Sequence, residues 1–388
     1  MNKNKTHWLT LSLIFSFGWA IIYFDRMMFT PIMDTLVHEY GLTASDIGIV
    51  FSLFFLGYTL LQIPGGILGD KVGINKIINL TFIGMAFVSL LSGLFVSFAA
   101  FVVLRFLAGA FEGLYYGPQF ALSSITLEKK TKVFATTIIN SGMSVGIILG
   151  TTLPLFLVHQ DINYKWLYGA VAFFSIVMLV LLKRFIPVVE NHGKAALFKP
   201  NKQLIKVFFV SFCSLYCFFN ILTWIQHYLA KEKLMDASTI ALGMLLISVV
   251  SIFSALIFSR LVDKFNAIKP FTFLLLALTI VSVIALTLST SSAFILAMII
   301  AYGAFGKMAL DPILIIAVAQ ANKDSSLSTT LSIFNFVGLL SSVIAPFVGG
   351  QILKYTGSLN GSFYFSAVLL AVALIVTCFF EKPSTQEA

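Results

Sequence analysis

The chain has 388 residues, of which 59% are hydrophobic and only 11% are charged, and its mean hydropathy is +0.98. A water-soluble domain carries roughly a quarter charged residues, so this composition excludes a soluble globular protein. The net charge of +9 does not indicate a nucleic-acid partner, because most basic residues flank apolar segments instead of forming one patch.

Twelve apolar segments follow one another along the chain, each about as long as a helix that crosses a bilayer, which takes about 20 residues. They cover residues 8–31, 46–68, 77–96, 98–126, 134–157, 166–182, 207–230, 239–259, 270–289, 293–320, 328–352 and 361–380. A transmembrane β-barrel would instead show segments of about ten residues that alternate in polarity, and these do not alternate. We therefore predict an all-α membrane protein with 12 transmembrane helices.

Basic residues lie mainly on one side of this predicted topology. With a cytoplasmic N-terminus, 18 of the 25 Lys and Arg residues fall in cytoplasmic segments and 4 fall in outer loops. An excess of Lys and Arg marks the cytoplasmic side of a membrane protein. We therefore expect a multi-pass protein of the cell (inner or plasma) membrane with both termini in the cytoplasm.

The chain divides into two similar halves around its longest hydrophilic stretch. We predict an N-terminal six-helix half at residues 1–186, a cytoplasmic linker at 187–204 and a C-terminal six-helix half at 205–388. The sequence from Gly66 to Gly73 is echoed from Ser259 to Asn266, 193 residues later. Pro118 and Pro312 are 194 residues apart, so nearly the same offset recurs. A parallel duplication of six helices is typical of transporters.

The repeated segment has the features of a gate between helices. An acidic residue at a helix end, with glycines and a basic neighbour, can bind the terminus of an adjacent helix and hold the cytoplasmic side shut. The alternative is a solvated loop whose charges only set the topology. The predicted gating residues are Gly66, Asp70, Lys71, Gly73, Asp263 and Lys264.

Six charged residues lie in the interior of the predicted spans, where a charge costs about 2.5 to 3.5 kcal/mol or more and is therefore a functional candidate. They are Asp25, Arg26, Arg105, Glu112, Lys307 and Asp311. Both arginines lie about 8 to 11 Å inside the outer ends of their helices, where they can form a carboxylate cradle with Lys307. The six charges sum to zero. Protonation of one carboxylate would leave the positive charge that a monocarboxylate neutralises.

We assign proton coupling to the three carboxylates Glu112, Asp25 and Asp311. Glu112 follows Arg105 by seven residues on the same helix face, so an anion held by Arg105 would leave Glu112 readier to take a proton. Asp25 is the weaker candidate, because Arg26 beside it should keep it ionised. For Asp311 the alternative is a structural ion pair with Lys307, four residues earlier.

Several motifs resemble those of the major facilitator superfamily and, within it, the anion:cation symporter family. The first half carries Tyr23-Phe24-Asp25-Arg26, Phe54-Phe55-Leu56-Gly57-Tyr58, Gln62-Ile63-Pro64-Gly65-Gly66 and a stretch from Arg105 to Gly113. The second half is similar more loosely, at Trp224 to Leu229 and at Asn335-Phe336-Val337-Gly338. Two departures stand out: Ile74 and Asn75 replace the family's basic residues, and the Lys307 and Asp311 pair is not a hallmark of the family.

The resemblance implies the major facilitator fold, with two pseudo-symmetric six-helix halves around a central cavity. It further implies proton-coupled symport of a small organic anion, a sugar acid or other carboxylate, by alternating access. We expect this anion and the lipid bilayer as partners, no nucleic acid, no cofactor beyond the coupling H⁺, and a monomer. The predicted substrate-binding residues are Tyr23, Arg26, Arg105, Tyr116, Trp224, Gln226, Lys307 and Asn335.

Two other functions fit the sequence less well. A proton-driven exporter of a drug, siderophore or metabolite could use the same fold, but paired arginines would repel the cationic drugs that many exporters carry. A membrane enzyme is disfavoured, because the sequence has no His, Cys or carboxylate cluster with metal-ligand spacing and no recognisable nucleophile motif. We therefore predict a transporter and neither an enzyme nor a metal site.

Overall fold

The computed structural model describes residues 3–29, 31–32, 35–36, 39, 41, 44–94, 97–160, 162–189, 198–322 and 326–381. The predicted linker at 187–204 lies partly outside these residues. The chain forms two compact units. Unit 1 comprises Met1–Glu128, Ile138–Phe198 and Asp324–Ile333, and unit 2 comprises Lys129–Thr137, Lys199–Lys323 and Phe334–Ala388.

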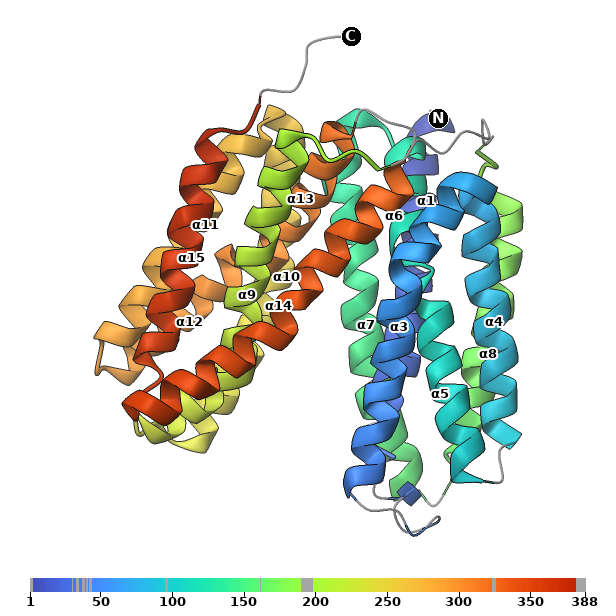
Figure 1. Cartoon of the computed structure of the whole chain (residues 1–388), viewed down its shortest axis with the longest axis horizontal. Helices are drawn as coiled ribbons and strands as arrows, with labels where there is room; N and C mark the ends of the chain where they lie inside the picture. Colours follow the sequence, from blue (N-terminus) through green and yellow to red (C-terminus); the bar gives the residue numbers. More distant parts are fainter. Residues whose placement is uncertain are drawn as a thin grey trace. The chain divides into compact units, whose positions relative to one another are not determined.

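Helices make up almost all of the described chain (Figure 1). Unit 1 is built mainly from α1 (Lys3–Met28), α3 (Ala44–Val72), α4 (Ile74–Leu94), α5 (Phe98–Gly113), α6 (Tyr116–Thr126), α7 (Lys132–His159) and α8 (Lys165–Phe185). Unit 2 is built mainly from α9 (Lys202–Lys231), α10 (Ala237–Phe265), α11 (Ile268–Leu288), α12 (Ser292–Phe305), α13 (Lys307–Ala321), α14 (Leu327–Thr356) and α15 (Asn360–Cys378). A short 3₁₀ helix, Lys129–Thr131, precedes α7.

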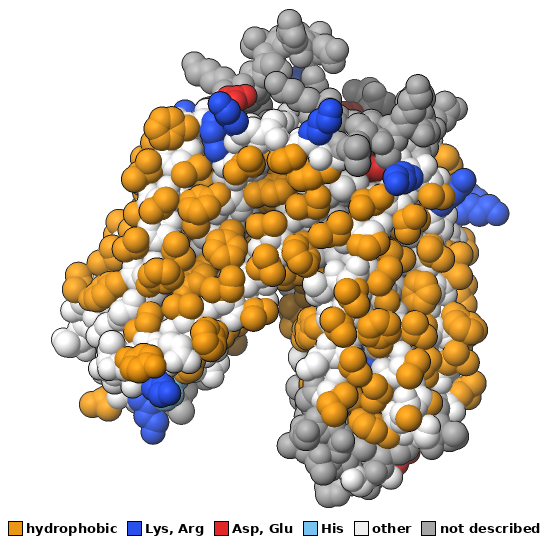
Figure 2. Space-filling view, in the orientation of Figure 1, with side chains coloured by type: hydrophobic (Ala, Val, Ile, Leu, Met, Phe, Trp, Pro, Cys, Tyr) orange, Lys and Arg blue, Asp and Glu red, His pale blue; other side chains and the backbone are white. Residues whose placement is uncertain are grey.

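Twelve helical stretches in the described residues are long and apolar enough to cross a membrane, which confirms the predicted spans. In unit 1, α3 packs along α5 and α4 packs along α8; in unit 2, α9 and α11 pack against α15. Large hydrophobic side chains such as Phe87, Phe173 and Phe253 are 60 to 63% exposed. Figure 2 shows such side chains along the sides of the helices, with Lys and Arg mostly near their ends. These surfaces suit lipid, and the chain is a multi-pass membrane protein.

The fourth and tenth spans are each made of two helices, where the sequence predicted one. In the fourth span, α5 ends before Leu114 and α6 begins at Tyr116. Pro118 has no N–H to donate to the Leu114 carbonyl, so one hydrogen bond of a continuous helix is missing at this break. The tenth span breaks at Gly306, whose ψ of −151° is extended.

Side chains of neighbouring helices satisfy the backbone that the break at Gly306 frees. The carbonyl of Phe305 accepts a hydrogen bond from the hydroxyl of Thr279 on α11 at 3.0 Å, and the carbonyl of Ala304 accepts one from Ser254 on α10. Broken helices are tolerated in a membrane where the freed groups find such partners. The sequence placed Pro312 in the tenth span but did not predict the break at Gly306. The hydroxyl groups that stabilise this break belong to residues distant in the sequence.

Glycines bring the backbones of α3 and α5 into direct contact. A Cβ atom added to Gly109 would lie 2.0 Å from the carbonyl oxygen of Phe54, and one added to Gly113 would lie 2.3 Å from that of Tyr58. Small residues allow this approach between transmembrane helices. The contact fixes the position of α5, which carries Arg105 and Glu112.

We expect that Gly109→Ala lowers the stability of the protein by about 1 to 3 kcal/mol, because the added methyl group forces two backbones apart. The matched control is Gly169→Ala on α8, where an added Cβ meets nothing within 4 Å. Thermal unfolding of the purified variants in one detergent measures the difference. Equal unfolding midpoints for the two variants would contradict the packing described for α3 and α5.

Candidate functional site

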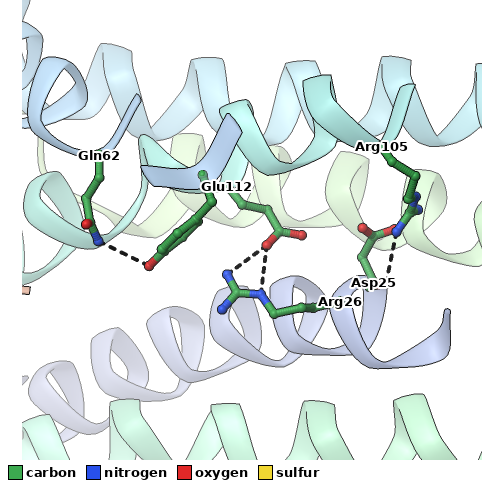
Figure 3. Close-up of polar contacts among 6 residues, drawn as sticks. Asp25, Arg26, Gln62, Arg105 and Glu112 are labelled. Carbon is green, nitrogen blue, oxygen red and sulfur yellow. Dashed lines mark hydrogen bonds and ion pairs between the residues drawn. The ribbon is translucent and has the colours of Figure 1, made fainter. Parts of the chain in front are cut away.

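Two ion pairs connect α1 and α5 inside unit 1 (Figure 3). The Arg26 Nη2 atom lies 2.8 Å from Glu112 Oε2, and Arg26 Nε donates to the same oxygen at 3.2 Å. The Arg105 Nη2 atom lies 3.2 Å from Asp25 Oδ1, and Nη1 donates to the Asp25 carbonyl at 3.4 Å. The four charged residues predicted inside the first and fourth spans therefore form one cluster of two ion pairs.

The ion pairs are shielded from solvent but leave spare polar atoms. Asp25 is 1% exposed, Glu112 is 0% exposed and Arg105 is 2% exposed. Within the described residues, Asp25 Oδ2, Glu112 Oε1 and Arg105 Nε have no hydrogen-bond partner. A carboxylate oxygen without a donor is a place for a proton, and an unused guanidinium N–H is a donor for an incoming anion.

The sequence did not predict which of these charges pair with one another. We expected Arg26 to keep its neighbour Asp25 ionised, and an anion at Arg105 to leave Glu112 readier to take a proton. In the structure Arg26 pairs with Glu112 and Arg105 pairs with Asp25, so each pair joins the two helices. Adjacent residues of a helix point about 100° apart, which separates the side chains of Asp25 and Arg26.

Aromatic rings surround the Arg26 guanidinium. Its central carbon lies 4.7 Å from the ring centre of Tyr23 and 4.6 Å from that of Tyr58. Gln62 is fully buried and donates its amide to the Tyr58 hydroxyl at 3.3 Å. The sequence predicted Tyr23 as a site residue but missed Tyr58 and Gln62. Their signal was two polar side chains, one helical turn apart, in an otherwise apolar span.

Both arginines line one pocket in unit 1. The pocket is lined by Arg26, Met27, Phe29, Val50, Phe51, Phe54, Phe55 and Arg105. The predicted convergence of Arg26 and Arg105 on a shared space thus agrees with the geometry, although their role in binding stays a prediction. The phenylalanines of this pocket were not predicted as site residues, because aromatic residues in an apolar span usually serve as packing.

Tyr116 lies in the packed interior at the start of α6. It is 5% exposed, and its ring lies 4.8 Å from that of Phe120 and 5.9 Å from that of Trp19. Trp19 donates its indole N–H to Gln119 at 2.8 Å. These contacts describe an aromatic core beside the ion pairs, and substrate contact by Tyr116 stays a prediction.

The other predicted substrate residues belong to unit 2. Lys307 is the first residue of α13, and its Nζ lies 3.9 Å from Asp311 Oδ2. Trp224 donates its indole N–H to the Pro346 carbonyl at 3.3 Å. Gln226 on α9 is exposed, and Asn335 on α14 is half-buried. Substrate binding by these residues and proton coupling by Asp311 stay predictions.

Asp70 caps a helix from the other half of the sequence, within unit 1. Its carboxylate accepts the backbone N–H groups of Ser328 at 3.0 Å and of Thr329 at 2.7 Å, and also the Thr329 hydroxyl at 2.5 Å. These groups lie at the N-terminus of α14, where a negative charge is favourable. Gly66 permits the approach, since a Cβ there would lie 2.6 Å from Ser332 Oγ.

Asp263 makes the equivalent contact in unit 2. It accepts the N–H groups of Val133 at 3.1 Å and of Phe134 at 2.8 Å, at the N-terminus of α7. The two capping aspartates therefore use the same geometry 193 residues apart. Lys264 is exposed beside the ring of Phe265, 5.5 Å from its centre.

The gating segments are helical, because α3 and α10 extend beyond the ends of the predicted spans 46–68 and 239–259. Gly66, Asp70 and the exposed Lys71 belong to the last turns of α3, and the helix ends before Gly73, whose φ is +122°. In unit 2, α10 ends before Asn266, whose φ is +47°. Helices continue beyond the apolar run because their own hydrogen bonds satisfy the backbone. A left-handed residue then ends each helix.

Comparisons with known proteins agree with this architecture. The family model of the Major Facilitator Superfamily matches residues 15–306 and 207–388. The voltage-gated purine nucleotide uniporter SLC17A9 of Mus musculus is 25% identical over 94% of this chain and 88% of its own length. The D-galactonate transporter of Escherichia coli O6:H1 is 24% identical over 95% of this chain and 94% of its own length. The crystal structure of the human organic anion transporter MFSD10 has a TM-score of 0.78 at 14% identity, over 97% of this chain and 100% of that one, and shows the shared fold.

Proposed function

The chain belongs to the Major Facilitator Superfamily and is a membrane transporter, and we propose that it carries a small organic anion together with protons by alternating access. One observation supports the proposal most directly: two buried arginines line one pocket, and each is paired with a buried carboxylate. The similar proteins are named for purine nucleotides, D-galactonate and organic anions. Their names differ on coupling, since one is a uniporter, so proton coupling rests on the residues of this chain.

The two ion pairs, each of which joins α1 to α5, suggest how an anion and a proton favour each other's binding. A carboxylate that binds the Arg26 guanidinium competes with Glu112 for the same donors. Glu112 would then be a buried charge without its partner, which is costly unless it takes a proton. The same exchange at Arg105 releases Asp25. Each ligand thus improves the binding of the other by the same factor.

Uptake by proteoliposomes under an imposed inward proton gradient tests the proposed cargo. The panel comprises aromatic monocarboxylates, sugar acids, dicarboxylates, a purine nucleotide and an organic cation. Only uptake above that of protein-free liposomes is counted, because protonated aromatic acids also cross lipid without a carrier. We expect accumulation of a carboxylate and none of the cation. Accumulation of the cation would overturn the proposal. The proposal would also be overturned if the protein binds no member of the panel and accumulates none.

We further propose that the capped N-termini of α14 and α7 act as gates that open during transport. Asp70→Ala should lower stability by about 0.5 to 2 kcal/mol, the usual effect of losing a helix cap. It should also speed the reaction of a thiol at the buried position Ser332→Cys with maleimide. The matched control is Lys71→Ala, an exposed neighbour on the same turn. If both variants leave the labelling rate unchanged, Asp70 does not hold this contact shut.

We propose that the protein lies in the cell membrane with both termini on the cytoplasmic side. In a Cys378→Ser background, a cysteine at the exposed position Gly357 should react with an impermeant thiol reagent added to intact cells. A cysteine at the exposed Lys130 should react only after the cells are opened. Labelling of position 130 from outside would reverse the topology.

A further inference from the structure

We propose that the pocket lined by Arg26 and Arg105 binds an aromatic ring, so that the cargo is a small aromatic monocarboxylate and not a sugar acid. The inference rests on the proposed function, because it names the class of anion for the same site. It is carried by the walls of the pocket, by the two arginines among its lining residues and by its size.

The walls of the pocket are hydrophobic and largely aromatic. Six of its eight lining residues are Met27, Phe29, Val50, Phe51, Phe54 and Phe55. The ring of Phe29 lies edge-on to that of Phe51 at 4.8 Å and 5.8 Å from that of Phe101. Phe54 and Phe55 are also edge-on, at 5.3 Å. Such rings favour another ring in an edge-on or offset position.

The polar groups of the lining are all cationic donors. Arg105 Nε is buried and has no hydrogen-bond partner within the described residues, and the Arg26 guanidinium lies 5.7 Å from the ring centre of Phe54. A guanidinium binds a carboxylate and also stacks on an aromatic face. A ligand with one carboxylate and one apolar ring therefore matches both kinds of group in the pocket.

A sugar acid matches these walls poorly. Each of its hydroxyl groups needs hydrogen-bond partners, and a buried hydroxyl without one costs about 1 to 3 kcal/mol. No lining side chain offers an acceptor to a hydroxyl, except the weak thioether of Met27. The pocket therefore discriminates against a polyhydroxylated chain of the same charge.

The free volume agrees with a single ring. The pocket volume of about 40 Å³ compares with roughly 10 to 15 Å³ for one water, so the pocket has room for about three waters. Any waters in this space would face mostly hydrophobic side chains. An aromatic ring that displaces them gains hydrophobic contact without leaving hydroxyl groups unpaired.

The test compares the binding of benzoate and gluconate, two monoanions, to the purified full-length protein by calorimetry. Binding is measured instead of uptake, because protonated benzoate crosses lipid without a carrier. We expect benzoate to bind at least about tenfold tighter. Phe51→Leu, at a half-buried wall position, should weaken benzoate about three- to tenfold and leave gluconate unchanged. Phe87→Leu on the exposed face of α4 is the control and should change neither.

Two further variants separate the possible failures. Phe55→Leu, at a wall residue that is 45% exposed, repeats the test should Phe51→Leu unfold. If gluconate binds, Arg105→Lys weakens its binding and benzoate does not bind, the inference of an aromatic cargo is wrong and the proposed function stands. The inference is equally overturned if Arg105→Lys weakens benzoate binding but neither phenylalanine variant changes the affinity for benzoate. If an anion binds and Arg105→Lys leaves its affinity unchanged, the anion site lies elsewhere and the inference falls, whereas the proposed function is tested separately by the uptake panel.

Discussion

Arg105→Lys should weaken the binding of the carboxylate substrate by about 10- to 100-fold while the protein stays folded. Lysine keeps a positive charge for Asp25 but lacks the planar fork and the Nε donor, which has no partner in the described structure. One charge-assisted hydrogen bond contributes about 1.5 to 3 kcal/mol, which corresponds to this loss in affinity. Calorimetric titration of the purified variant measures the effect.

The choice of variant and control separates binding from folding. Arg105→Ala would leave Asp25 buried without a partner, at a cost of about 3 to 5 kcal/mol, and is therefore a poor test. Arg105→Gln combined with Asp25→Asn removes both charges and should abolish binding in a folded protein. Arg184→Lys, at a side chain that lies beside the ring of Phe185, is the control. Unaltered binding by the double variant would place the anion elsewhere.

Glu112→Gln should exchange the substrate across the membrane but should no longer accumulate it against a gradient. In the structure one Glu112 oxygen accepts from Arg26 and the other has no partner. Glutamine reproduces this arrangement with an acceptor towards Arg26 and a donor in place of the protonated oxygen. It therefore mimics permanently protonated Glu112 at nearly constant shape, and its substrate binding should depend less on pH.

Counterflow and gradient-driven uptake in the same proteoliposomes separate the two activities. Asp25→Asn is the matched comparison, because Asp25 is equally buried and also has one unpartnered oxygen. We expect both carboxylates to contribute, with the larger loss of accumulation at Glu112, whose partner Arg26 is the more accessible arginine. Full accumulation by Glu112→Gln together with a loss in Asp25→Asn would exchange their roles.

The sequence predicted the membrane spans because hydropathy depends on local composition. All twelve spans were recognised, and the clustering of Arg26, Arg105 and Glu112 in unit 1 follows from the cost of isolated charge in lipid. The partners within the cluster could not be predicted. Asp25 and Arg26 are neighbours in the chain, and only the packing of α1 on its neighbours decides which of them meets Glu112.

Contacts between distant residues account for the other differences. Asp70 was recognised as a residue that binds a helix terminus, but its partners Ser328 and Thr329 lie 258 and 259 residues away. The break at Gly306 depends likewise on hydroxyl groups of α10 and α11. The aromatic pocket was missed for a different reason. Phe51 and Phe54 have no local feature that distinguishes a pocket wall from ordinary packing.

Proton movement during substrate entry tests proton-coupled transport of a carboxylate most directly. Proteoliposomes contain a pH-sensitive dye, start without a proton gradient and receive the carboxylate that the uptake panel identifies. The account predicts that the lumen acidifies faster than in protein-free liposomes as the carboxylate enters, and that Glu112→Gln reduces this difference. Entry of the carboxylate through the parent protein with no acidification beyond that of protein-free liposomes would contradict proton coupling.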